Sequence, residues 1–479
     1  MPAPCRIEII RLFGGCAAVG CFLIGGLAQA RDASPVPVKI QIEPQVVVAR
    51  IAPDFIGFGY ETSALAQTNY FGGDNTALIQ LYRNLTTNGL IRIGGNISDH
   101  TRYVAEAPTE VRTEQETTVI NRASLDRLAA FAGATGWKVM WGLNLGTGTK
   151  EEAVVEAKAV VKALGSNLQS FEIGNEVDIH GRYRWSGRSY ADYYSNYLAF
   201  KAAVRDALPR AEFSGPDVAG NLNWLVSFSG SESKDLKLLT HHYYRADAKS
   251  DQSSLNQLLQ PDERWVRVLT RLRQVSRDCG VPYRINEVNS FSGGGKVGVS
   301  DTFGSALWCL DYMFLLASYG CGGVNMETDI NQHAWLSHYS PIVHDEQGRC
   351  HPCAEYYGML AFSIAGKGDL VKVNLEKSDI NLTAYAVEPQ DHVLWVVIIN
   401  KDLTNSAAAK VVLPSGFSEA AIFRLQAPSV ESKDQINFGD GNFASDGTWT
   451  MGKPIGLKSV HDEAVFTMPC ASAALVRLN

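Results

Sequence analysis

Eight short apolar runs recur between residues 55 and 326, and each is followed by a polar or Gly-rich loop and then by a helical pattern. The helical stretches include 125–134, 153–164 and 190–208, the last of which stops at Pro209. The apolar runs are FIGFGY (55–60), LIRI (90–93), KVMWGLNL (138–145), SFEI (170–173), AEFS (211–214), LTHHYY (239–244), YRI (283–285) and GVNM (323–326). Strands alternating with helices indicate βαβ units, and eight of them predict an α/β fold of the (β/α)8 TIM barrel type. A dinucleotide-binding fold has no support, because no Gly-rich phosphate fingerprint follows the first run.

The pattern changes near residue 370, where helical periodicity ends. Short β-rich runs such as 382–389 and 392–400 alternate there with turn clusters, which predicts an antiparallel β-sandwich. The strand-like segment 38–49 precedes the barrel, so we expect it to pair with the C-terminal sheet. The expected division is a signal peptide at 1–30, a catalytic barrel at 51–364, and a sandwich made of 33–50 together with 365–479.

The N-terminus has the layout of a secretory signal peptide. Arg6 and Arg11 precede an apolar run at 12–27, and a small-x-small site ends at Ala30. The run is short for a membrane span, although an N-terminal anchor that is kept is the alternative. We therefore expect cleavage near Ala30 and a secreted or periplasmic protein with no membrane attachment after signal removal.

Six cysteines follow the expected cleavage site, and an even number in an exported protein permits disulfides. They are Cys279, Cys309, Cys321, Cys350, Cys353 and Cys470. The pairing is left open, and free buried thiols are the alternative. The motif Cys350-His351-Pro352-Cys353 has no second CxxC to complete a structural zinc site, and the histidines near the C-terminal end of the barrel lack a metal spacing. We expect no metal and no cofactor.

The net charge bears on the partner. The chain has 43 Lys and Arg against 50 Asp and Glu, a formal charge of −7. A nucleic-acid binder needs a basic surface, so a nucleic-acid partner is not expected. The charge also argues mildly against a densely sulfated polysaccharide.

Two glutamates follow apolar runs at positions where barrel enzymes carry their chemistry, the carboxyl ends of strands. Gly174-Asn175-Glu176 follows the fourth run, and Asn286-Glu287 follows the seventh. Glycoside hydrolysis needs one protonated and one ionised carboxyl group on opposite sides of a cleft. The pair Glu176 and Glu287 therefore predicts a glycosidase, with Glu327 at the end of the eighth run as the rival carboxylate.

The sixth run supplies a further candidate. Side chains alternate along a strand, so His241 and Tyr243 share one face while His242 and Tyr244 share the other. We expect His241 and Tyr243 to face inward, with Tyr243 donating a hydrogen bond to Glu287 and holding it ionised. The alternatives are that His242 and Tyr244 form the inward pair, or that all four side chains belong to the core.

These motifs carry a family resemblance. IGNE at 173–176, HHYY at 241–244 and NE at 286–287 resemble retaining glycosidases of clan A. The stretch from Glu287 through the glycines at 293–295 to Phe303, together with IRIGGN at 91–96, resembles glycoside hydrolase family 79, the β-glucuronidases and heparanases. The resemblance covers most of the chain and implies a barrel with a sandwich and hydrolysis with retention.

The resemblance also implies residue roles. Glu176 matches the acid/base and Glu287 the nucleophile, while Glu61 resembles the acidic residue that binds the far hydroxyls of the sugar. The family's carboxylate loop matches Gly293 and Gly294, beside Gly295, and Tyr339 resembles a carboxylate-binding tyrosine. Ser292 stands where family members often carry Tyr. Further expected substrate contacts are Asn96, Asp99, Asn175 and His241.

A Gly-rich turn fits this role physically, because several N–H groups can converge on an anion without Cβ clashes. The expected function is removal of terminal β-D-glucuronic acid, including a 4-O-methylated form, from an oligosaccharide or polysaccharide by double displacement. The alternatives are a heparanase-like endo-β-glucuronidase, another clan A exo-glycosidase such as a xylosidase or glucosidase, and a carbohydrate-binding protein without activity.

Overall fold

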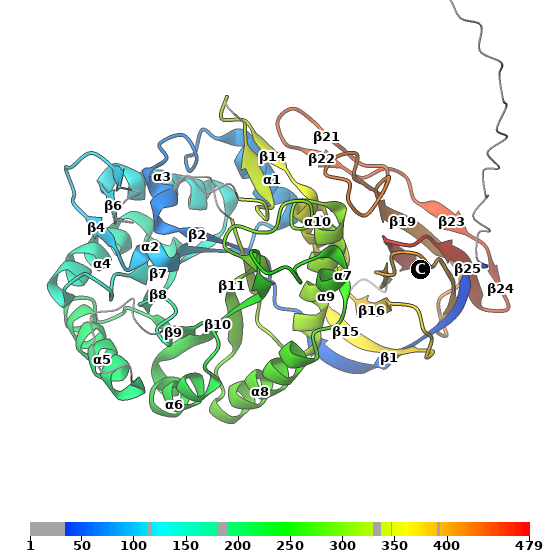
Figure 1. Ribbon diagram of the computed structural model, residues 1–479, viewed down its shortest axis with the longest axis horizontal. Coiled ribbons are helices and arrows are strands. Elements are labelled where there is room, and N and C mark those ends of the chain that lie inside the picture. Colours follow the sequence, from blue (N-terminus) through cyan, green and yellow to red (C-terminus); the bar gives the residue numbers. More distant parts are fainter. Residues whose placement is uncertain (1–33, 113–116, 180–188, 329–336, 346, 390–392) are drawn as a thin grey trace, which may run out of the picture. The chain divides into compact units, whose positions relative to one another are not determined.

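Eight parallel strands close into a barrel in the order β10-β11-β12-β2-β3-β7-β8-β9, with helices around them (Figure 1). The strands are β2 (Gly57–Glu61), β3 (Leu90–Gly94), β7 (Lys138–Leu143), β8 (Leu168–Ile173), β9 (Phe213–Val218), β10 (Leu236–Asp247), β11 (Tyr283–Ser292) and β12 (Val324–Glu327). The predicted (β/α)8 barrel is therefore confirmed. Its strands are buried on both faces, which explains their nearly continuous apolar runs.

This computed structural model describes residues 34–479, except 113–116, 180–188, 329–336, 346 and 390–392. The expected signal peptide lies outside the described residues. Residues 35–479 form one compact unit. Within the described part of the chain, no helix is long and apolar enough to cross a membrane.

Most helices connect successive barrel strands. The α-helices of the described residues are α1 (Thr76–Leu85), α2 (Gly95–Ser98), α3 (Arg122–Thr135), α4 (Lys150–Leu164), α5 (Tyr190–Ala207), α6 (Leu222–Glu232), α7 (Leu255–Leu259), α8 (Glu263–Cys279), α9 (Phe303–Ser318) and α10 (Ala354–Ala365), the last of which follows the barrel. Capping boxes at Asn121, Thr149 and Ser189 start α3, α4 and α5, because each N-cap side chain accepts a backbone N–H that the helix leaves unpaired. The three helical stretches predicted from periodicity are thus confirmed.

A second sheet of eleven strands is built mainly from the C-terminal part of the chain. Its members are β1 (Val36–Arg50), β15 (Asp369–Leu375), β16 (Leu382–Glu388), β17 (Leu394–Asn400), β18 (Ala407–Val412), β19 (Ala420–Gln426), β20 (Asn437–Phe438), β23 (Ile455–Leu457), β24 (Ser459–Val460), β25 (Glu463–Met468) and β26 (Ser472–Leu478). β1 pairs antiparallel with β15 and parallel with β18, so the pre-barrel segment joins this sheet as expected. The predicted sandwich is a single curled sheet, antiparallel except at the β1–β18 pair.

Both faces of this sheet are covered. On β17, Val396 and Ile398 pack into the core of the curled sheet, while Val397 and Ile399 belong to the core that continues into the barrel. Polar contacts cross the same boundary: Asp311 of α9 binds Lys401 Nζ at 2.5 Å and the Tyr385 hydroxyl at 2.8 Å. The sheet therefore supports the barrel on the side of α9.

Short strands lie outside these two sheets. They are β4 (Thr101–Tyr103), β5 (Glu110–Arg112), β6 (Thr117–Ile120), β13 (Ile342–His344), β14 (Cys350–Pro352), β21 (Asn442–Phe443) and β22 (Trp449–Thr450). The six cysteines expected in the mature protein are all free thiols. Of the two alternatives for them, the structure has free thiols, three of them buried, and burial raises the pKa of Cys321 to about 11.

Candidate active site

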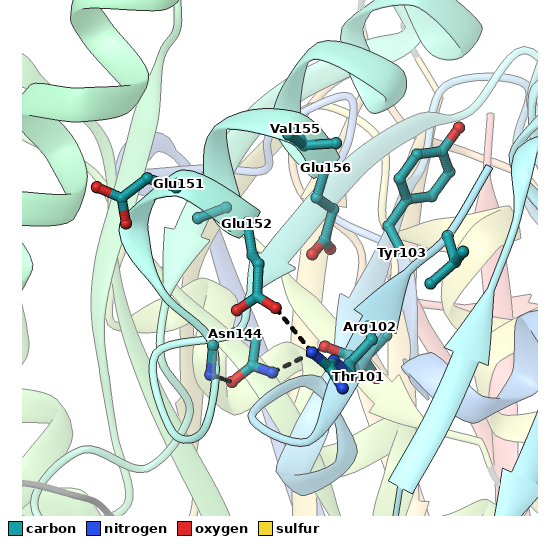
Figure 2. Close-up of a pocket in the computed structure, with 11 residues that line it drawn as sticks. Thr101, Arg102, Tyr103, Asn144, Glu151, Glu152, Val155 and Glu156 are labelled. Carbon is teal, nitrogen blue, oxygen red and sulfur yellow. Dashed lines mark hydrogen bonds and ion pairs between the residues drawn. The ribbon is translucent and has the colours of Figure 1, made fainter.

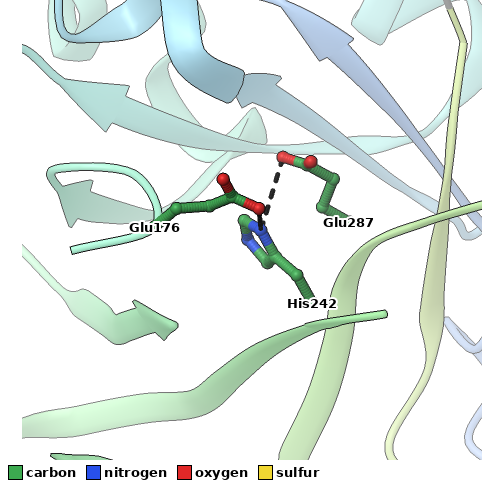
Figure 3. Close-up of side chains that lie close together, drawn as sticks. All are labelled: Glu176, His242 and Glu287. Carbon is green, nitrogen blue, oxygen red and sulfur yellow. Dashed lines mark hydrogen bonds and ion pairs between the residues drawn. The ribbon is translucent and has the colours of Figure 1, made fainter. Parts of the chain in front are cut away.

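Glu176 and Glu287 face each other across the carboxyl end of the barrel (Figure 3). One carboxylate oxygen of each residue and a ring nitrogen of His242 all lie within 4.8 Å of one another. Retaining glycosidases hold their two carboxyl groups about 5–5.5 Å apart, and inverting enzymes hold them about 6.5–9.5 Å apart. The spacing of this pair fits double displacement. Glu327, the rival carboxylate, is buried at the end of β12 and is not a member of this cluster.

Three side chains surround the Glu287 carboxylate. Arg92 Nη1 donates to Oε2 at 2.6 Å, the Tyr244 hydroxyl donates to Oε1 at 3.1 Å, and His242 Nδ1 lies 3.6 Å from Oε2. Burial by itself would raise the Glu287 pKa, but the positive charges of His242 and Arg92 outweigh it and the pKa is lowered. Glu287 is therefore ionised, as a nucleophile must be.

His242 joins the two glutamates. Its Nδ1 lies 3.2 Å from Oε1 of Glu176, and its Nε2 lies 2.9 Å from Oδ1 of Asp217. Burial would lower the His242 pKa, but the charges of Glu287 and Asp217 outweigh it and raise the pKa well above its ordinary value. A doubly protonated ring has no nitrogen lone pair to offer a metal ion. It can instead donate hydrogen bonds to the neighbouring carboxylates.

Arg92 lies fully buried beneath the pair and compensates its charge. It contacts Glu172 at 3.2 Å, Asp217 at 2.6 Å and the Asn175 side-chain oxygen at 2.6 Å. Burial and the charge of Asp217 raise the pKa of Glu172 to about 8, which keeps it neutral. Arg92 and His242 then balance Asp217 and Glu287, so the buried network carries no uncompensated charge.

The prediction that His241 and Tyr243 of β10 face into the barrel is wrong. The Tyr243 hydroxyl donates to Asp262 at 3.0 Å, and its ring stacks on Trp265 of α8 at 4.1 Å. His241 also packs near Trp265 and bonds a backbone carbonyl, so it does not reach the site. The inward pair is His242 and Tyr244, the alternative that strict alternation allows. The β10–β11 register shifts between His241 and His242, which places His242 opposite Glu287.

Asp99 bonds the backbone of two loops near the site. Its Oδ1 accepts the backbone N–H groups of Leu145 and Gly146 at 3.0 Å, and its Oδ2 accepts that of Asn175 at 3.2 Å. The residue is buried, and these bonds hold the loops after β7 and β8; its contact with a sugar stays a prediction.

Glu61, Asn96 and Asn175 line one side of the site. Glu61 accepts the N–H groups of Asn96 and Ile97 at the start of α2, at 3.2 Å and 2.7 Å. Burial and the charge of Glu287 raise the Glu61 pKa to about 8. Asn175 donates to the Asn96 side chain at 3.2 Å, next to Glu176. Their contacts with a sugar stay predictions.

The Gly-rich turn directly follows the end of β11. Gly293, Gly294 and Gly295 have φ angles of 75°, 87° and 86°, which side chains rarely adopt. His338 N donates to the Gly294 carbonyl at 2.6 Å, and the Tyr339 ring stacks against Tyr244 at 6.3 Å. The structure thus brings the turn and Tyr339 together beside Tyr244. Ser292 is the last residue of β11, and its hydroxyl lies 3.5 Å from the Ala246 carbonyl. The role of these residues in carboxylate binding stays a prediction.

Sequence reasoning missed Asp217 and Asn286 as members of the site. The fifth run is predicted to end at residue 214, whereas β9 continues to Val218 and carries Asp217 at its carboxyl end. Asn286 bonds Asp217 and also donates to Glu172 at 2.8 Å. The available signal was the position of Asp217 just beyond the predicted strand end.

A separate cavity of about 420 Å³ lies between β4 and the start of α4 (Figure 2). Glu156 projects into it, with one oxygen accepting the Trp141 indole N–H at 2.8 Å. Arg102 and Glu152 form an ion pair of 2.9 Å on its exposed side. Neither glutamate of the candidate pair lines this cavity.

No protein-family model matches the chain. A β-glucuronidase of Aspergillus niger is 27% identical over 95% of this chain and 94% of its own length. A β-glucuronidase of Neurospora crassa is 24% identical over 78% of this chain and 76% of its own. Heparanase-like protein 3 of Arabidopsis thaliana is 22% identical over 61% of this chain and 56% of its own length.

Solved structures share the fold. A 4-O-α-L-rhamnosyl-β-D-glucuronidase from Fusarium oxysporum has a TM-score of 0.75 and 18% identity over 91% of this chain and 99% of its own. An α-L-arabinofuranosidase from Thermotoga maritima has a TM-score of 0.68 and 15% identity over 92% of this chain and 99% of its own. The resemblance to the β-glucuronidases and heparanase-like proteins of glycoside hydrolase family 79 is therefore confirmed, by sequence similarity to β-glucuronidases over most of the chain and to a heparanase-like protein over part of it.

Proposed function

We propose that this glycoside hydrolase is an exported, retaining exo-β-glucuronidase that removes terminal β-D-glucuronic acid from a glycan. The observation that carries the proposal is the Glu176–Glu287 pair, with carboxylate oxygens within 4.8 Å and Glu287 held ionised. The relatives named β-glucuronidase support the choice of sugar.

The reaction proceeds in two displacements. Glu287 attacks the anomeric carbon while Glu176 gives its proton to the glycosidic oxygen, so the bond to the aglycone breaks and a glycosyl-enzyme ester forms. Glu176, now a carboxylate, takes a proton from water, and that water attacks the same carbon and releases Glu287. His242 supports the exchange, because its 3.2 Å contact with Oε1 holds the Glu176 carboxyl group in place.

Recognition of the uronate carboxylate is assigned to the turn at Gly293–Gly295 and to Tyr339. A buried carboxylate without hydrogen-bond donors is costly, so a site selective for it needs several N–H or O–H groups. The turn has the left-handed glycine geometry that lets adjacent N–H groups converge on an anion.

Hydrolysis of a panel of aryl β-glycosides tests the sugar. The glucuronide should be preferred over the glucoside and xyloside, and a glucoside hydrolysed equally well would contradict the carboxylate site. Proton NMR of the first product should show the β-anomer, because retention follows from double displacement.

A heparanase-like endo-glycosidase is the second candidate, favoured by the similarity to heparanase-like protein 3. Comparing cleavage of an aryl glucuronide with cleavage inside heparan sulfate separates the two. Export is tested by N-terminal sequencing of the protein recovered outside the cytoplasm, which should begin at Arg31.

A further inference from the structure

Asn289 lies on β11 two residues beyond Glu287 and is completely buried. Its amide nitrogen donates to the Glu327 carbonyl at 3.0 Å and to the Tyr339 carbonyl at 3.2 Å, and it lies 3.4 Å from Oε1 of Glu355. One side chain therefore links the nucleophile strand to the end of β12 and to the segment that carries Tyr339.

The oxygen of the same amide is connected to the Gly-rich turn at Gly293–Gly295. Asn289 Oδ1 accepts the Ser290 N–H at 2.6 Å and lies 3.2 Å from the Ser290 hydroxyl. Ser290 Oγ is 2.8 Å from Ser300 Oγ, which accepts the Lys296 N–H at 2.9 Å. Lys296 directly follows Gly295, so this buried chain of hydrogen bonds ends at the Gly-rich turn.

The Gly-rich turn and the segment that carries Tyr339 also contact each other. His338 N donates to the Gly294 carbonyl at 2.6 Å, and a Cβ on Gly295 would lie 3.0 Å from the Tyr339 nitrogen. With so little space between them, a shift of either segment changes the distance between the turn amides and the Tyr339 ring. Both segments are connected to Asn289, one directly and one through Ser290 and Ser300.

We infer that Asn289 is a positioning residue for sugar selectivity: it fixes the spacing between the turn at Gly293–Gly295 and Tyr339, and thereby the fit of the uronate carboxylate. The inference rests on the proposed function, which assigns carboxylate binding to these two segments. Asn289 acts through them and does not touch the sugar. A residue needed only for folding would affect charged and uncharged substrates alike.

Asn289→Asp is the sharpest variant, because it keeps the shape and the acceptor but removes both N–H donors. Kinetics are measured with an aryl β-glucuronide and with its methyl ester, which lacks the negative charge. For the free acid we expect kcat/KM to fall by about tenfold or more, mainly through KM, and for the ester by less than about threefold. Thermal unfolding of the variant is measured in parallel.

Ser290→Ala provides a second, milder variant, because it removes the hydroxyl that contacts Asn289 Oδ1 and Ser300 but keeps the Ser290 N–H bond to Oδ1. It should lower kcat/KM for the acid by about threefold and leave the ester unchanged. Equal losses on acid and ester in either variant, or an unchanged preference for the acid in both, would overturn the inference. A wild-type enzyme that does not prefer the acid to the ester would overturn the proposed carboxylate site itself, and the inference with it.

Discussion

The Tyr244 hydroxyl donates a 3.1 Å hydrogen bond to Oε1 of Glu287, and this contact shows which face of β10 looks into the barrel. Its neighbour Tyr243 points the other way, toward Asp262 and Trp265. The two adjacent tyrosines therefore have different surroundings, and they form a matched pair for mutagenesis.

Tyr244→Phe should lower kcat by about 10- to 100-fold, because Glu287 loses a donor that orients its carboxylate. Tyr243→Phe should leave kcat within about twofold and lower the free energy of unfolding by about 1 kcal/mol, through loss of the bond to Asp262. Steady-state kinetics and denaturant unfolding of both variants check this. The opposite ranking in kcat would place Tyr243 in the site.

Glu287→Gln should reduce turnover of an aryl β-glucuronide by about 10⁴-fold or more, because an amide cannot form the glycosyl ester. Glu327→Gln is the comparison, since Glu327 is the other carboxylate at the end of a neighbouring strand; it should retain a measurable kcat. Mass spectrometry with a slowly released 2-fluoro glucuronide should show the label on Glu287. Near-normal activity of Glu287→Gln would refute the nucleophile assignment.

Replacing His242 should move the pH profile. The His242 cation helps to lower the Glu287 pKa, so His242→Asn raises that pKa, and Glu287 becomes protonated at a higher pH. The acidic limb of kcat/KM should therefore shift upward by about one to three pH units. His241→Asn, on the outer face of β10, should leave the acidic limb in place. An unshifted limb in His242→Asn would mean that its charge does not tune the nucleophile.

Glu156 makes the stability depend on pH. Burial raises its pKa from 4.5 to about 7, so the folded state holds a proton that the unfolded state releases above pH 4.5. Its contribution is complete below about pH 4.5 and is lost as the pH rises to about 7. Glu156→Gln cannot ionise and keeps an acceptor for Trp141, so above pH 7 it should be more stable than wild type by up to about 3 kcal/mol.

Unfolding in denaturant at pH 4 and pH 8 measures this difference, which should be near zero at the lower pH. Glu151→Gln, on the exposed rim of the same cavity, is the control and should change stability by less than about 0.5 kcal/mol at either pH. A Glu156→Gln variant that is equally stable relative to wild type at both pH values would contradict the raised pKa.

Much of this protein could be predicted from local patterns. Periodicity is a property of neighbouring residues, so it predicted the eight strands, the three capped helices and the pairing of 38–49 with the C-terminal sheet. The positions of Glu176 and Glu287 followed from the rule that strand ends meet at one edge of a parallel barrel. Strand ends were less certain, because β10 and β11 continue through polar residues that the barrel buries.

The sequence by itself determined the fold class and the two carboxylates, since these depend on residue type and spacing along one strand. Only the tertiary structure decided which face of β10 turns inward, that Asp99 serves the loops, and that Asp217 joins Arg92 and His242 under the site. Alternation along a strand gives relative faces and not an absolute one, and the register shift beside His241 moves the pattern by one residue. Hydrogen bonds between β9, β10 and β3 depend on distances that no local pattern contains.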